Sequence, residues 1–161
     1  MHAPSGSPKH YVRLAEQRDV DYLATRLRVA DLDEIAANNG SSPREALQRG
    51  YETSTQCYVG VTDDRPFIIF GAGPVEQGVG GVWGLGSDDI EAAKMSFLRQ
   101  SRFWVDVMHK EYPLLFNYVD ARNTFHIRWL RWLGFTFINK HPHYGVAHLP
   151  FYEFVRISPH V

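Results

Sequence analysis

The chain has 161 residues, of which 44% are hydrophobic and 22% charged, and its formal net charge is −1. This length corresponds to one domain, and the near-neutral charge argues against a dedicated nucleic-acid-binding protein, which usually has a basic excess. The single cysteine excludes an internal disulfide, and no apolar run approaches the roughly 18–20 residues of a membrane span. These features predict a protein made in the cytosol, with neither a membrane span nor a specific nucleic-acid partner.

The two ends of the chain differ in composition. Residues 1–10 (MHAPSGSPKH) contain Pro, Gly and Ser and lack the apolar stretch of a signal peptide. We expect a flexible N-terminal arm there, and a single domain over residues 11–161.

The first predicted elements are a strand and a long helix. Residues 11–14 alternate between polar and apolar as a short strand does. Asp19 can cap a helix whose apolar spacing continues to about Ala37. Gly40 suits the left-handed residue that closes a helix. We therefore expect one uninterrupted helix between Asp19 and Ala37.

A short helix and three strands are expected next. Residues 42–45 (SPRE) form a capping box with proline at the first helical position, which predicts a helix start. Residues 56–62 and 65–72 have the pattern of two strands joined by a tight turn. The glycine-rich segment 71–81 lacks the spacing of a nucleotide-binding loop and leads into no helix, so it is interpreted as a hairpin. A third strand follows at 81–85.

The second half is expected to contain the longest helix, at 91–112, opened by Asp88. Its predicted inner stripe consists of Met95, Leu98, Val105 and Met108. The remaining elements are a strand at 114–119, a helix at 124–133 between the cap Asn123 and Gly134, and strands at 135–138 and 151–157. This order predicts a mixed α/β fold in which helices cover both faces of a mixed sheet.

Residues 123–135 (NTFHIRWLRWLGF), preceded by the strand-like residues 115–122, carry a recognisable motif. The spacing from Asn to Gly, together with the element order, resembles the Gcn5-related N-acetyltransferase (GNAT) fold. Physically, the Asn caps the helix and the Gly lets the chain turn into the next strand. The resemblance implies a mostly antiparallel mixed sheet.

A second resemblance is closer. It rests on residues 117–119 (NYV), 123–124 (NT) and 126–128 (HIR), with Trp83, Ser87 and Asp88. This set is similar to the internal virion protein A family of T7-like podophages, small phage proteins with an acetyltransferase-like fold that are tied to head and internal-core assembly. The resemblance extends loosely over residues 11–158 and is clearest at 113–137. It implies a phage virion or assembly protein.

Acetyltransferases of this fold bind the pyrophosphate of acetyl-CoA on backbone N–H groups before the long helix, as helix N-termini bind anions. The matching residues are Leu85, Gly86, Ser87, Asp88 and Asp89. They include no basic side chain, and the carboxylates would repel a diphosphate by on the order of a few kcal/mol. We therefore expect no cofactor, and acetyl-CoA held by these five residues is the alternative.

The expected catalytic acid is also missing. Many enzymes of this fold carry a Tyr in the Asn-to-Gly helix that protonates the leaving thiolate, and the matching residue here is Leu130. No catalytic residue is therefore assigned. An active enzyme would need a non-standard acid, for which Tyr118 or His126 are the candidates, and Asn123 near the thiol.

Three histidines, His141, His143 and His148, lie close together near Glu153. Alternate residues of a strand share a face, so a metal site is conceivable. No Cys or well-spaced carboxylate completes a ligand set, and we predict a polar loop and no metal.

Arg128 and Arg131 alternate with Trp129 and Trp132 on the motif helix. The pattern predicts a core face of Trp and Leu with a solvated Arg face. The alternative is a protein interface, because such surfaces are rich in aromatic residues and Arg.

Two functions follow. The favoured one is a podophage virion or assembly protein that uses a catalytically degenerate acetyltransferase-like fold as an interaction scaffold. Its partners would be other virion proteins (portal, internal core or neck proteins) or copies of itself, and it would reside in the virion. The alternative is an acetyl-CoA-dependent N-acetyltransferase acting on a small amine or a protein amine.

Overall fold

The computed structural model describes residues 9–159, apart from the side chain of Lys94. Seven strands form one sheet in the order β1-β2-β3-β4-β5-β7-β6. The strands are β1 (His10–Leu14), β2 (Gln56–Thr62), β3 (Arg65–Glu76), β4 (Val79–Gly86), β5 (Leu114–Asp120), β6 (Thr136–Tyr144) and β7 (Leu149–Ile157). The helices are α1 (Gln17–Leu23), α2 (Val29–Asn38), α3 (Pro43–Thr53), α4 (Ile90–His109) and α5 (Thr124–Trp132).

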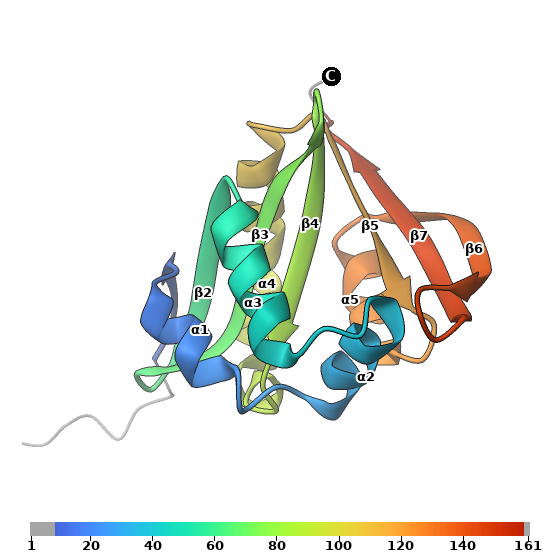
Figure 1. The fold of residues 1–161 in the computed structure, drawn as a ribbon. Helices are drawn as coiled ribbons and strands as arrows, with labels where there is room; N and C mark the ends of the chain where they lie inside the picture. Colours follow the sequence, from blue (N-terminus) through green and yellow to red (C-terminus); the bar gives the residue numbers. More distant parts are fainter. Residues whose placement is uncertain (1–8, 160–161) are drawn as a thin grey trace, which may run out of the picture.

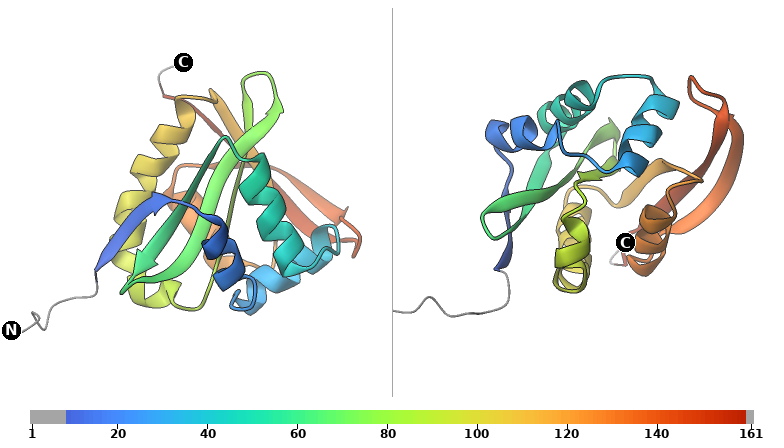
Figure 2. Two further views of the ribbon diagram at one scale, coloured as in Figure 1. Left: turned by 60° about the vertical axis from the view of Figure 1, so that its left-hand side comes forward. Right: turned by 90° about the horizontal axis from the view of Figure 1, so that it is seen from below.

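Helices cover both faces of the sheet. Figure 2 shows α1, α2 and α3 on one face and α4 and α5 on the other. A large core that contains Phe67, Phe97 and Leu115 includes residues of α4, α5 and the sheet. A smaller core that contains Val20, Leu47 and Ile69 lies under α1 to α3. The predicted mixed α/β architecture is confirmed.

The sheet is antiparallel except at its centre, where β4 and β5 run parallel. These two strands pair only where Val79–Gly81 faces Leu114–Phe116. Figure 1 shows that they meet at one end and then diverge. The divergence leaves backbone groups of both strands without a ladder partner, and side chains and helices must fill the space between them.

The single helix predicted from Asp19 to Ala37 is wrong. The chain leaves the helical path after Leu23, and Leu27 forms an isolated bridge with Ser87 beyond the end of β4. The Arg28 N–H also donates to the Gly86 carbonyl at 2.8 Å. These tertiary hydrogen bonds outweigh the local preference for a continuous helix.

The predicted caps of two helices also need correction. Helix α1 begins earlier than expected, so that Asp19 lies in its first turn and accepts the Glu16 N–H at 2.8 Å. The N-cap of α4 is Asp89 and not Asp88, and the Asp89 side chain makes no capping hydrogen bond. The Ser87 hydroxyl accepts the Asp89 N–H instead, at 3.2 Å.

The predicted inner stripe of α4 is half correct. Val105 and Met108 are buried, whereas the side chain of Met95 is 64% exposed. Phe97 and Ala93 occupy the buried face instead. A methionine at a helical spacing can face either the core or solvent, because a shift of the buried face by one residue position moves that side chain to the edge of the face.

Other local predictions are confirmed. Segment 71–81 lies in the β3–β4 hairpin, which turns at Gly78. Gly134 closes α5 with a φ of +90°. The predicted arm at residues 1–10 lies mostly outside the described residues, and His10 belongs to β1. None of the helices over residues 9–159 has the length and apolar character needed to cross a membrane.

Candidate functional site at the divergence of β4 and β5

The side chain of Asn117 bridges the two diverging strands. Its Nδ2 donates to the Val82 carbonyl on β4 at 2.8 Å, and its Oδ1 accepts the Tyr118 N–H at 2.8 Å. The Asn117 side chain therefore replaces a backbone hydrogen bond between β4 and β5, one residue beyond the last paired residues, Gly81 and Phe116. This pairing leaves the Val82 carbonyl satisfied within the chain.

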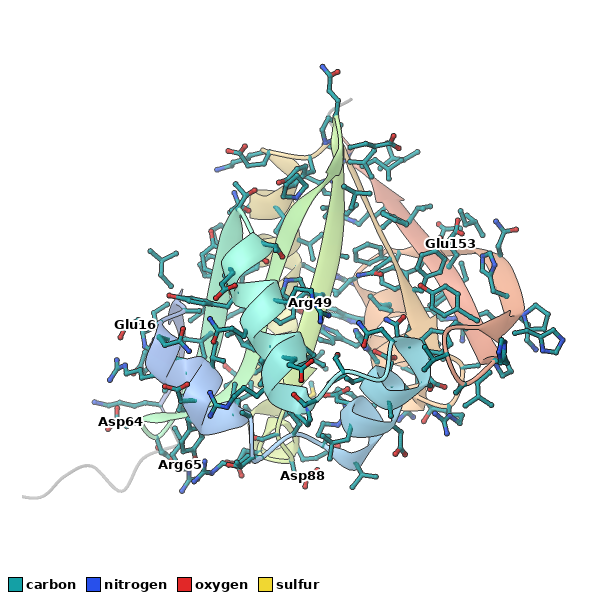
Figure 3. The ribbon with its side chains drawn as sticks, in the orientation of Figure 1. Glu16, Arg49, Asp64, Arg65, Asp88 and Glu153 are labelled. Carbon is teal, nitrogen blue, oxygen red and sulfur yellow. The ribbon has the colours of Figure 1, made fainter. Side chains whose placement is uncertain are left out.

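A polar cavity of about 270 Å³ lies on the side of α2 and α3. Its polar lining includes Glu34, Arg49, Asn117, Tyr118 and His126. Figure 3 shows the side chain of Arg49, a residue of α3, over the middle of the sheet. The cavity is large enough for several water molecules or a small ligand.

The opposite side of the divergence is nearly closed. The cavity there has about 40 Å³ and an almost wholly apolar lining. The rings of Phe97 on α4 and Trp129 on α5 lie 5.3 Å apart between their centroids, and the Trp129 Nε1–H donates to the Ser101 hydroxyl at 3.2 Å. These contacts pack the two helices together next to the sheet and leave only the small cavity there. His126 lines both cavities and therefore lies between them.

The turn from β4 to α4 is tied to α2 by a buried carboxylate. The Gly86 N–H donates to Asp31 Oδ2 at 3.0 Å, and Asp31 is only 2% exposed. The Ser87 N–H donates to the Phe67 carbonyl at 2.9 Å, and the Ile90 N–H donates to the Ser87 carbonyl. Several N–H groups around this turn therefore have partners inside the chain.

Two acidic side chains stand at the same turn. Asp88 is exposed, and a carboxylate oxygen of Asp89 lies 3.8 Å from the Nε of Arg65. Figure 3 shows Arg65 and Asp88 at the same end of the molecule. Arg65 comes from the β2–β3 hairpin, and the sequence did not identify it as a neighbour of this turn.

Asp31 also organises a buried polar cluster. Its Oδ1 accepts from Arg28 Nη1 at 3.3 Å and from Asn123 Nδ2 at 3.2 Å. Arg28 Nη2 donates to Asn123 Oδ1 at 3.3 Å. Asn123 is the N-cap residue of α5, as predicted, and its carbonyl accepts the Ile127 N–H at 3.0 Å. Its side chain makes no capping hydrogen bond and instead joins α2 to the start of α5.

Glu34 lies one turn further along α2 and lines the polar cavity. Burial, followed by the nearby charges of Asp31 and Asp120, raises the pKa of Glu34 to about 8, although the Asp120 N–H bond at 2.8 Å favours the charged form. The carboxyl is therefore largely protonated at neutral pH. Sequence reasoning missed Asp31 and Glu34, for which the available signal was two acids three residues apart on one helix.

The three candidate catalytic residues are only partly brought together. Tyr118 and His126 line the same cavity, whereas Asn123 reaches it through Glu34, whose Oε1 lies 3.5 Å from Asn123 Nδ2. Burial lowers the pKa of His126, which favours a neutral imidazole. Burial, with a smaller contribution from Glu153, raises the pKa of Tyr118.

The predicted polar loop that contains the three histidines is wrong for two of them. His141 and His143 belong to β6, and only His148 lies between strands. His141 Nε2 lies 3.1 Å from a carboxylate oxygen of Glu153. Over the described part of the chain, no group of three or more His, Cys, Asp or Glu side chains is placed to hold a metal ion.

Comparisons with solved structures identify the fold. The yncA protein of Salmonella typhimurium, a putative acetyltransferase determined with its cofactor acetyl-CoA, superposes with a TM-score of 0.70 at 13% identity, over 94% of this chain and 95% of that chain. Spermidine N-acetyltransferase from Vibrio cholerae, in complex with CoA and spermine, gives 0.68 at 8% identity, over 92% and 97%. The chain has the GNAT fold.

The sequence comparisons are narrower. Residues 76–142, less than half of the chain, match the family described as "Bacteriophage T7, probable scaffold protein Gp13". No curated protein has a matching sequence. The matched residues, which are similar to phage scaffold proteins, include β4, α4, β5 and α5.

We expect the substitution Asp31→Ala to lower the free energy of unfolding by about 3–5 kcal/mol, because it leaves Arg28 and the Gly86 N–H without their buried partner. Chemical denaturation measures the change, and Asp33→Ala on the exposed side of the same helix is the matched control. The control is expected to change stability by less than about 0.5 kcal/mol. Equal effects of the two substitutions would contradict the role given to Asp31.

The raised pKa of Glu34 predicts a pH dependence of stability. The folded pKa of about 8 exceeds the unfolded value of about 4.3, so the stabilisation from protonated Glu34 is complete below the unfolded pKa. It is lost as the pH rises towards 8 and is absent above that value.

We expect Glu34→Gln to remove this loss. The free energy of unfolding of the variant, relative to that of the wild type, should therefore rise by a few kcal/mol between about pH 5 and pH 9. Urea unfolding at several pH values measures it. Glu45→Gln, in the first turn of α3, is the control and should follow the wild type. Parallel curves for the Glu34 variant and the wild type would show that this carboxyl is not the group responsible.

Proposed function

We propose that this chain is a phage virion or assembly protein that uses a catalytically degenerate acetyltransferase-like fold as a protein–protein interaction scaffold. Its partners would be other virion proteins, such as portal, internal core or neck proteins, or further copies of itself. It would be made in the host cytoplasm and reside in the virion. The match to the phage scaffold family over residues 76–142 supports this proposal, whereas the fold alone is compatible with many functions.

The observation that carries the proposal is the hydrogen bond between the Asp31 carboxylate and the Gly86 N–H. A diphosphate bound at this turn would need that N–H, and it would have to displace a buried anion that belongs to the protein. Displacement would leave Asp31 charged, buried and repelling the ligand. The residues at the turn therefore fit a diphosphate poorly.

Two further features agree with this argument. Asp88 and Asp89 add negative charge at the same turn, with Arg65 as the nearby cation. The contact between Phe97 and Trp129 leaves only a small apolar cavity of about 40 Å³ beside the divergence of β4 and β5, on the side of α4 and α5.

One observation favours an acetyl-CoA-dependent N-acetyltransferase as the second candidate. Glu34 has a pKa of about 8 and lines a polar cavity with Tyr118 and His126. A carboxylate with a pKa near the working pH is suited to accept a proton from an amine. Leu85, Gly86, Ser87, Asp88 and Asp89 would then hold acetyl-CoA, with Asn123 near the thiol.

Calorimetric titration with acetyl-CoA separates the two functions. We expect no saturable heat up to about 1 mM, a limit set by the usual range of enzyme affinities. Purified particles of the phage that encodes the chain are expected to contain it, as measured by mass spectrometry. Micromolar binding of acetyl-CoA, or normal particles without the chain, would favour the second candidate.

A further inference from the structure

A groove with an apolar floor lies between α4 and α5, on their outer side. It has a volume of about 260 Å³ and is lined by Leu98, Phe125, Arg128, Trp129 and Trp132. It lies on the face of the sheet opposite α1 to α3 (Figure 2) and is separate from the polar cavity that contains Glu34.

Residues at and beside the groove follow a helical spacing. On α5, Phe125, Arg128 and Trp132 follow one another at intervals of three and four residues and therefore share one side of the helix. On α4, Arg102 follows Leu98 by four residues, and Met95 precedes Leu98 by three. Phe125 to Trp132 spans eight residues, or seven residue steps, which corresponds to roughly 10 Å of helix, or two turns.

Two large apolar side chains at or near the groove are exposed. Trp132, which lines the groove, is 37% exposed, and Met95, about one helical turn before Leu98 on α4, is 64% exposed. Exposed apolar side chains are common singly, whereas their occurrence beside an apolar groove is typical of interaction sites. Trp and Arg are also the residue types that contribute most to protein interfaces.

The rim of the groove is basic. Arg102 is held over the Trp132 ring at 3.7 Å from the centroid and donates to the Trp132 carbonyl at 2.9 Å, so one arginine is fixed at the edge. Arg128, which lines the groove, is exposed, and neither Arg128 nor Arg102 forms an ion pair within the described residues. Asp106, one turn beyond Arg102 on α4, is paired with Arg156. The groove therefore has two arginines without an ion-pair partner beside it.

We propose that this groove docks an amphipathic helix of another protein, with apolar side chains on one face and Asp or Glu on either side of them. The apolar floor requires the first feature and the unpaired arginines favour the second, while two turns of groove fit a helix of two to three turns. The inference rests on the proposed scaffold function and gives it a partner chemistry. The net charge of −1 and the apolar floor favour a protein over a nucleic acid.

Synthetic helical peptides test the groove on the full chain. One peptide has Leu at positions i, i+3, i+4 and i+7 with flanking Glu, a second has Lys in place of Glu, and a third has the acidic sequence scrambled. Amide NMR shifts map the site, and a titration gives the affinity. We expect saturable binding of the acidic peptide with shifts confined to α4 and α5, and at least tenfold weaker binding of the other two.

Charge reversal identifies the residues responsible. Arg128→Glu is expected to weaken the acidic peptide at least tenfold and to strengthen the Lys peptide, and Met95→Glu is expected to weaken both peptides. Arg18→Glu on α1 is the matched control, because Arg18 is exposed on the other face and pairs with Glu16 at 2.8 Å. The control should bind as the wild type does, and thermal unfolding confirms that all variants are folded.

Several results would overturn the inference. One is that the acidic peptide does not bind, and another is that Arg128→Glu leaves its binding unchanged. A third is that the groove prefers a single-stranded oligonucleotide. The fourth is that light scattering shows a dimer in which a second copy of the chain occupies the groove. With any of these and no heat from acetyl-CoA, the groove inference fails while the scaffold function stands. If acetyl-CoA binds and Arg128→Glu weakens that binding, both the groove inference and the scaffold function are contradicted.

Discussion

The buried hydrogen bond between Asp31 and the Gly86 N–H is the contact on which the arrangement of this protein depends. It joins α2 to the end of β4 at the point where the two central strands diverge. A buried carboxylate is costly unless it is well paired, and here Arg28 and Asn123 provide the other partners. The break between α1 and α2 follows from the same constraint, because the chain must bend for Arg28 and Asp31 to reach Gly86. Glu34, one turn later, is thereby placed in a poorly solvated position where its proton is retained.

The same contact supports the proposal that this acetyltransferase-like fold serves as a scaffold. The backbone N–H groups before a helix attract anions in general, and in this chain the anion is an internal side chain. Phe97 and Trp129 also pack against each other between α4 and α5, with their ring centroids 5.3 Å apart. What remains open is the polar cavity near Glu34 on one face and the groove lined by Trp132 on the other. The scaffold proposal uses the outer surface, whereas the enzyme alternative would use the polar cavity.

Sequence reasoning succeeded where the signals are local. The pattern of residues 56–62 gave β2 with its bounds, and Gly134 has the positive φ expected of a residue that closes a helix. It failed where partners are distant in the chain: Asp31 and Gly86 are 55 residues apart, and Glu34 and Asp120 are 86 apart. The motif correctly identified Asn123 as the N-cap residue of α5, but the local pattern could not reveal that its side-chain amide contacts Asp31 of α2. Of the five residues from Leu85 to Asp89, the first two end β4 and the other three lie between β4 and α4. Sequence reasoning could not reveal that the Gly86 N–H is bound by Asp31.

The Gly86 N–H is already bound within the protein by Asp31. Amide hydrogen exchange and the NMR shift of Gly86, measured with and without acetyl-CoA, provide the decisive test of this contact. We expect slow exchange of this amide and no shift on addition of 1 mM acetyl-CoA, about the upper limit of ordinary enzyme affinities. Fast exchange in the free protein, followed by protection and a large shift with acetyl-CoA, would contradict it and would show that the turn binds the cofactor's diphosphate.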